Sequence, residues 1–151
     1  MIKSKRLTSS LTGISGEYFV AAELSRRGFM ASITLRNNDS VDIHASNISN
    51  NKIFAIQVKT NQSGNRSWIL NMRSESHQNE NFFYIFVALK GLAERPEYFI
   101  VPSKNVADFV KRDYAHWIAT PGKKGQAHNE SKVRKFDDKN EEYLEQWKLL
   151  E

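Results

Sequence analysis

Two runs of alternating apolar and polar residues lie close together in the first half of the chain. They cover residues 41–45 and 53–59, and in each run the apolar side chains recur at every second position. Because successive side chains of a strand point to opposite faces, both runs predict half-buried β-strands. The stretch between them is rich in Asn and Ser, which predicts a turn and therefore a hairpin. Asp42, Gln57 and Lys59 are then expected on the side opposite to the apolar residues of their strands.

A helical pattern precedes this hairpin. Apolar residues recur every three or four positions between about Ser9 and Arg27, which predicts an amphipathic helix ending at Gly28. The stripe expected on its buried side consists of Leu7, Leu11, Ile14, Tyr18, Ala21 and Leu24 or Ser25. Glu17 lies in or beside that stripe, where a carboxylate needs a cation or hydrogen-bond donors. Gly16 allows the helix backbone to approach a sheet closely.

The rest of the chain predicts more strands and two more helices. Residues 82–89 form a continuous apolar run, which is typical of a central strand covered on both faces. Other strands are expected at residues 31–36 (Ile33 and Leu35 inward), 68–72 and 97–101, with a turn or short helix at 74–81. One helix should begin with Ser103 as N-cap and end near Arg112, and a terminal helix should begin at Asp138 and dock on the core. Residues 114–135 are left unassigned.

Composition narrows the possible functions. The chain of 151 residues fits a single domain, 1–151, and its 40% hydrophobic and 26% charged residues are ordinary for a globular protein. There is no cysteine, which excludes disulfides, thiolate catalysis and cysteine zinc sites. The four histidines show no paired metal-ligand spacing. No apolar run is long enough to span a membrane and no signal-peptide pattern is present, so a cytoplasmic protein is expected.

The net charge of +5 is unevenly distributed. Residues 1–36 carry six Lys/Arg and two acids (+4), and residues 90–135 carry ten Lys/Arg and five acids (+5). Residues 37–89 are neutral with four of each, and residues 136–151 carry two Lys and six acids (−4). Basic surface binds polyphosphates by releasing counterions, so DNA is the expected partner. The candidate nucleic-acid contacts are Lys123 and Lys124, in a turn-rich loop with an exposed flexible loop as the alternative, together with Arg36 and Arg66.

The order of the polar residues resembles the PD-(D/E)XK nuclease superfamily. That superfamily combines Glu on a first helix, Asp opening one strand and acid-x-Lys on the next, matched here by Glu17, Asp42 and Gln57-Val58-Lys59. The segments Gly16–Leu24 and Arg27–Phe29 are similar to the first helix of its archaeal Holliday-junction-resolvase and restriction-endonuclease-like branches. Two positions depart from the motif, since Val41 replaces Pro and Gln57 replaces Asp or Glu. Asp39 is a rival for the metal-site acid.

The resemblance implies an α/β, restriction endonuclease-like core with a central mixed β-sheet flanked by helices. It further implies a Mg²⁺- or Mn²⁺-dependent endonuclease that hydrolyses DNA. Glu17, Asp42, Gln57 and Lys59 would be the catalytic residues, the first three holding the metal. Gln57 removes one negative charge, so metal binding should be weaker than in an acid-x-Lys site. The alternative is a catalytically silent nuclease-fold module that binds nucleic acid or a protein, and a homodimer is left open.

Overall fold

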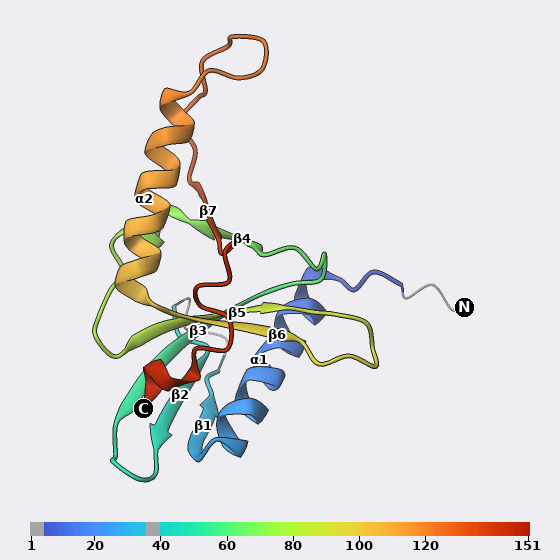
Figure 1. Ribbon diagram of the computed structural model, residues 1–151, viewed down its shortest axis with the longest axis vertical. Coiled ribbons are helices and arrows are strands. Elements are labelled where there is room, and N and C mark those ends of the chain that lie inside the picture. The colour runs from blue at the N-terminus through green and yellow to red at the C-terminus, as the bar shows by residue number, and fades with distance from the viewer. Residues whose placement is uncertain (1–4, 36–39) are drawn as a thin grey trace.

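A computed structural model describes residues 5–35 and 40–151 (Figure 1). Its elements are α1 (Ser9–Arg26), β1 (Phe29–Ile33), β2 (Ile43–Asn47), β3 (Ile53–Asn61), β4 (Ser67–Asn71), the short 3₁₀ helix η1 (Met72–Glu75), β5 (Phe82–Ala88), β6 (Glu97–Pro102), α2 (Ser103–Ala119), β7 (Val133–Asp137) and the 3₁₀ helix η2 (Trp147–Leu150). None of the helices within these residues is long and apolar enough to cross a membrane.

Five strands form the central sheet in the order β1-β2-β3-β5-β6. β3 and β5 run parallel and the other neighbouring pairs run antiparallel, so the sheet is mixed. β4 and β7 form a separate two-stranded sheet in which Asn71 is paired with Val133. The mixed sheet flanked by α1 and α2 confirms the predicted α/β class with a central mixed β-sheet flanked by helices.

A buried apolar cluster lies on each face of the central sheet. β5 divides its side chains between them, because Phe83 and Ile85 enter one cluster while Phe82 and Tyr84 enter the other. The first cluster includes side chains from α1 and η2, and the second includes side chains from α2, β4 and β7. Helix α2 extends away from the central sheet and ends in a loop at its far end (Figure 1). The sheet therefore separates an α1 layer from an α2 layer.

Several sequence predictions are confirmed. The hairpin of β2 and β3 pairs Ile43 with Ile56, and α1 has nearly the predicted length. Gly28 follows α1 with φ of +87°, a conformation that glycine adopts without strain. Every residue of β5 is buried, as expected for a central strand.

The buried face of α1 differs from the predicted stripe. Leu11 and Tyr18 are 53% and 64% exposed, and Leu7 is exposed as well. The buried residues are Thr12, Gly16, Val20, Glu23 and Leu24. A Cβ on Gly16 would lie only 1.8 Å from Oγ1 of Thr60, so the helix backbone rests directly on β3 at this point. Thr12 and Gly16 thus face the sheet beside Val20 and Leu24, whereas Leu11 and Tyr18 turn outward.

Two predicted element boundaries are also wrong. The first strand begins at Phe29, which is buried, whereas Ile33 is 38% and Leu35 is 86% exposed. Helix α2 continues past the predicted end near Arg112 to Ala119. Tyr114 and Trp117 stack on one another in its last turns.

The predicted role of Ser103 as N-cap is wrong as well. Pro102 occupies the cap position, and no side chain caps the helix. The Ser103 hydroxyl instead donates to the carbonyl of Asn79 and accepts from its N–H, at 2.9 and 3.0 Å.

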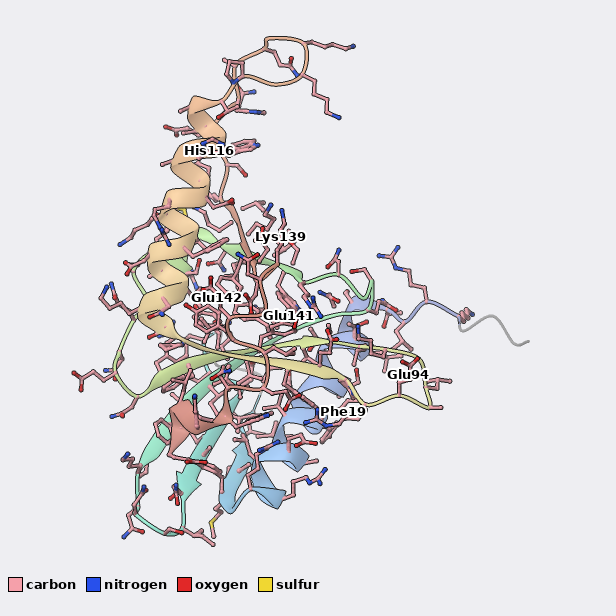
Figure 2. The ribbon with its side chains drawn as sticks, in the orientation of Figure 1. Phe19, Glu94, His116, Lys139, Glu141 and Glu142 are labelled. Atoms are coloured by element: carbon pink, nitrogen blue, oxygen red, sulfur yellow. The ribbon has the colours of Figure 1, made fainter. Side chains whose placement is uncertain are left out.

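The predicted terminal helix does not form. After β7 the Asp138 carboxylate accepts hydrogen bonds from the N–H groups of Glu142 and Tyr143, at 2.9 and 2.8 Å. Glu141 and Glu145 adopt positive φ of 59° and 54°, which interrupts a right-handed helix. Figure 2 shows Glu141 and Glu142 on this irregular segment. Trp147 and Leu150 near its end are buried in the α1-side cluster, as the prediction of docking required.

Candidate functional site

The candidate site lies where β2 and β3 separate. The backbone N–H of Asp42 donates to the carbonyl of Ile56 at 2.9 Å, and the Asp42 carbonyl accepts from the N–H of Thr34 at 2.9 Å. Continuing the register of the hairpin by one residue places Asp42 opposite Gln57. Beyond this point β3 runs on without β2. Oδ2 of Asp42 accepts a hydrogen bond from the Val58 N–H at 2.6 Å, so a side chain replaces the next strand partner.

Gln57 and Lys59 both line an open hollow of about 1080 Å³ on the α2 side of the sheet. They alternate with Ile56 and Val58, which are buried in the α1-side cluster. No hydrogen bond or ion pair of either polar side chain is present within residues 5–35 and 40–151. The strand alternation read from the sequence thus brings an amide and an ammonium group to one accessible surface.

The walls of this hollow come from distant parts of the chain. Tyr84 belongs to the neighbouring strand β5, where it is paired with Gln57. Burial raises the pKa of Tyr84 to about 12, so its phenol stays neutral at physiological pH. The other walls are Ser40, Leu70, Asn71, the η1 region with Met72, Arg73, Ser74, Ser76 and His77, and Lys132.

Glu17 approaches from the opposite layer. It is half-buried and follows Gly16, which rests on Thr60, the residue after Lys59. Neither Glu17 nor Asp42 is among the described residues that line the hollow. Of the four predicted site residues, Gln57 and Lys59 therefore share this described surface, and Glu17 and Asp42 are not part of its lining. Asp42 lies instead at the gap where β2 and β3 separate, with its carboxylate bonded to the Val58 N–H.

The donors around this gap suit a hard divalent cation in type. Two carboxylates, Glu17 and Asp42, and the amide oxygen of Gln57 are the oxygen ligands that Mg²⁺ prefers, and it needs few of them. Within the described part of the chain, no three His, Cys, Asp or Glu side chains are grouped closely enough to hold a metal. A metal site here would therefore need the amide oxygen of Gln57 as one of its ligands.

The four candidate nucleic-acid contacts have different surroundings. Lys123 and Lys124 are exposed in the loop that follows α2, and Figure 2 shows His116 near the end of α2 from which that loop extends. Arg66 forms ion pairs with Glu97 at 3.5 Å and Glu141 at 2.7 Å, so two carboxylates already balance its charge. Arg36, like the rival acid Asp39, lies outside the described residues.

The sequence reading did not identify Arg73, Lys132 or Tyr84 as part of this surface. Arg73 and Lys132 are far apart in the sequence, and the pairing of β4 with β7 brings the segments that carry them together. The basic excess in residues 90–135 was a signal for Lys132, although it did not indicate this position. Nothing in the local pattern around Arg73 distinguished it from other surface cations.

No protein-family model and no curated protein sequence matches the chain. Its structure is similar to that of the bacterial homing endonuclease I-Ssp6803I, with a TM-score of 0.53 and 12% sequence identity over 95% of this chain and 91% of that one. It also matches Hjc, a Holliday junction resolvase from Archaeoglobus fulgidus, with a TM-score of 0.46 and 16% identity over 83% and 84% of the two chains. The first similarity spans nearly all of both chains. This chain therefore has the restriction endonuclease-like fold that the resemblance of its sequence implied.

Proposed function

We propose that the protein is a metal-dependent endonuclease that hydrolyses DNA phosphodiester bonds. The observation that carries this proposal is the placement of Asp42 at the gap between β2 and β3, with Gln57 and Lys59 on an open surface beside it. In the order of the sequence these residues match the motif of the superfamily, with Gln57 in place of an acid, and this match supports the proposal.

Asp42 and Gln57 would hold the divalent ion, with Glu17 completing the set of ligands directly or through water. The bound ion would polarise a phosphodiester oxygen and make a water molecule more acidic. Asp42 is well suited to this role because its backbone is held by Ile56 and Thr34 and its side chain by the Val58 N–H. Hydrogen bonds of this kind fix the orientation of a metal-binding side chain before the ion binds.

Lys59 would act on the substrate itself. Its ammonium group is positively charged and can donate three hydrogen bonds. Lys59 lines the same hollow as Gln57. It would stabilise the negative charge that develops on the phosphate during hydrolysis, or orient the attacking water. Tyr84, neutral at physiological pH, would offer a hydrogen bond without repelling the phosphate.

Lys123 and Lys124 would bind the DNA backbone away from the reacting bond. They are exposed on the loop at the far end of α2, where the chain projects from the central sheet (Figure 1). Contacts to phosphates fix the position of the protein on DNA but carry no base information. Arg66 is the weakest of the proposed contacts, because Glu97 and Glu141 compete with phosphate for its guanidinium.

The test is incubation of the purified protein with duplex, single-stranded and branched DNA, with and without Mg²⁺ or Mn²⁺. Cleavage by the wild type that requires the ion and is lost in Asp42→Ala and Lys59→Ala would support the proposal. The two variants should differ in metal binding, because Lys59→Ala removes a positive charge near the ion and leaves the ligands in place. Absence of cleavage of all three substrates with both ions would refute the enzymatic proposal.

Light scattering would measure whether the chain forms the homodimer left open by the sequence.

A catalytically silent nuclease-fold module that binds nucleic acid or a protein is the second candidate. The observation that favours it is the neutral Gln57, together with the absence of three grouped acids or histidines among residues 5–35 and 40–151. Salt-dependent DNA binding without ion-dependent cleavage would select this candidate over the enzyme.

A further inference from the structure

The hollow beside Gln57 and Lys59 differs in charge from other hollows on this surface. Its described lining contains three cationic side chains, Lys59, Arg73 and Lys132, and no Asp or Glu. By contrast, the hollow between α2 and the segment after β7 contains Asp108, Asp137, Asp138 and Glu142 with only Arg112 and Lys139 as cations. Three cations within one described lining favour the binding of a polyanion.

Arg73 and Lys132 are held next to one another by the backbone. The N–H of Met72 donates to the carbonyl of Lys132 at 2.9 Å, which joins the start of η1 to the residue preceding β7. Asn71 caps η1, since its side chain accepts a hydrogen bond from the Arg73 N–H at 2.9 Å. The two cations therefore line the hollow from two adjoining segments, which we call its rim, and Lys59 lines the hollow from β3.

A buried arginine supports that rim from behind. Arg134 is only 6% exposed, and its Nη1 donates to the carbonyls of Ser131 and Val133, the two neighbours of Lys132, at 2.7 and 2.9 Å. Its Nε donates to the carboxylate of Glu75 on η1 at 2.5 Å, and its guanidinium stacks on Tyr114 of α2. The backbone on both sides of Lys132 and the η1 turn carrying Arg73 are thus connected by one side chain, which prearranges the rim for a ligand.

We propose that Arg73 and Lys132 form a second phosphate-binding subsite, which holds the substrate strand at a phosphate next to the one that faces Lys59. This inference rests on the proposed function and extends it, because it assigns the path of the strand across the hollow. The subsite contributes binding and position, and the reacting phosphate stays with Lys59 and the residues at the gap between β2 and β3.

The test compares two doubly substituted variants that lose the same charge. Arg73→Gln with Lys132→Gln removes the proposed contacts and keeps the aliphatic parts of both side chains. Lys52→Gln with Lys148→Gln is the matched control. Both lysines are exposed, and neither lines the hollow. Lys52 donates to the C-terminal residue, and Lys148 belongs to η2 on the α1 side. All four positions are exposed, so both variants should fold, which their melting curves would verify.

The measured quantity is the salt dependence of DNA affinity. Each phosphate contact contributes about 0.9 to the slope of log K against log salt concentration on duplex DNA, so the subsite variant should lose about 1.8. Over a fourfold rise in salt the wild type should consequently lose roughly tenfold more affinity than this variant. The loss should be the same for all DNA sequences, because phosphate contacts carry no base information. If the slope of the subsite variant equals that of the control, the proposed subsite is wrong.

A second probe separates this inference from the proposed function. If the wild type binds no DNA, the proposed function fails, and inorganic pyrophosphate then decides the subsite. Pyrophosphate should raise the melting temperature of the wild type and the control but not of the subsite variant. An equal response of all three proteins, or no response of any, would overturn the subsite.

Discussion

A methyl group added to Gly16 tests the close contact between α1 and β3. An ideal Cβ at this position would lie 1.8 Å from Oγ1, 2.9 Å from Cβ and 3.0 Å from Cγ2 of Thr60. Thr60 cannot easily move aside, because it is β-branched and its backbone is paired with Val87 in the parallel ladder of β3 and β5. Gly16→Ala therefore forces the helix and the strand apart.

Gly13 provides a matched control within the same helix, because a Cβ there would meet no atom within 4 Å. Replacing a helical glycine with alanine stabilises by about 1 kcal/mol through helix propensity alone, and Gly13→Ala should show this gain. Gly16→Ala has the same gain but adds overpacking that costs about 1–3 kcal/mol. Its net effect should be a loss of roughly 0–2 kcal/mol, which places it about 1–3 kcal/mol below Gly13→Ala.

Urea denaturation with a common m-value would measure both free energies of unfolding. Thr60→Ala added to Gly16→Ala should restore part of the loss, since it removes Oγ1 and Cγ2 from the clash, and a double-mutant cycle would quantify this coupling. If Gly16→Ala is as stable as Gly13→Ala, α1 does not rest on β3 as described. The position of Glu17 relative to Lys59 would then need a different explanation.

Three further predictions concern the site and the electrostatics of the fold. Mg²⁺ or Mn²⁺ at about 100 times its Kd should stabilise the wild type by about 2.7 kcal/mol in a thermal melt, with tighter binding in Gln57→Glu and no shift in Asp42→Ala. Lys123→Ala with Lys124→Ala should weaken DNA binding equally for all sequences in a filter or anisotropy assay, and a sequence-dependent loss would contradict phosphate contact. Glu23 is buried, which by itself raises its pKa, but a hydrogen bond and the charge of Arg95, with two further arginines, lower the pKa overall. Its stabilising effect is therefore complete above the ordinary value of 4.5 and lost as pH falls through the lower folded value, so acid unfolding of Glu23→Gln should be less steep.

Elements with a strong local pattern were predictable from the sequence. The hairpin of β2 and β3 follows from period-2 alternation, and β5 follows from an uninterrupted apolar run. The same alternation brought Gln57 and Lys59 to one surface, because strand geometry alone decides which side chains share a face. For the same reason Asp42 could be assigned to the polar side of its own strand, whereas its position opposite Gln57 follows from the register of the hairpin.

Tertiary contacts decided the features that local pattern left ambiguous. The face of α1 that is buried depends on the approach of Gly16 to Thr60, and a stripe of apolar residues does not reveal such a contact between backbones. The end of the chain is irregular because Asp138 binds the N–H groups of Glu142 and Tyr143, although its apolar spacing is helical.

The cationic rim of the hollow is also a product of tertiary structure. Arg73 and Lys132 meet only through the pairing of β4 with β7, and the sequence contains no local record of a pairing between such distant segments. The alternation of side chains along a strand follows from local backbone geometry. The pairing of distant strands depends instead on which surfaces the rest of the fold leaves to be covered. The sequence by itself therefore determined the polar residues at the centre of the site, and the tertiary structure determined the walls around them.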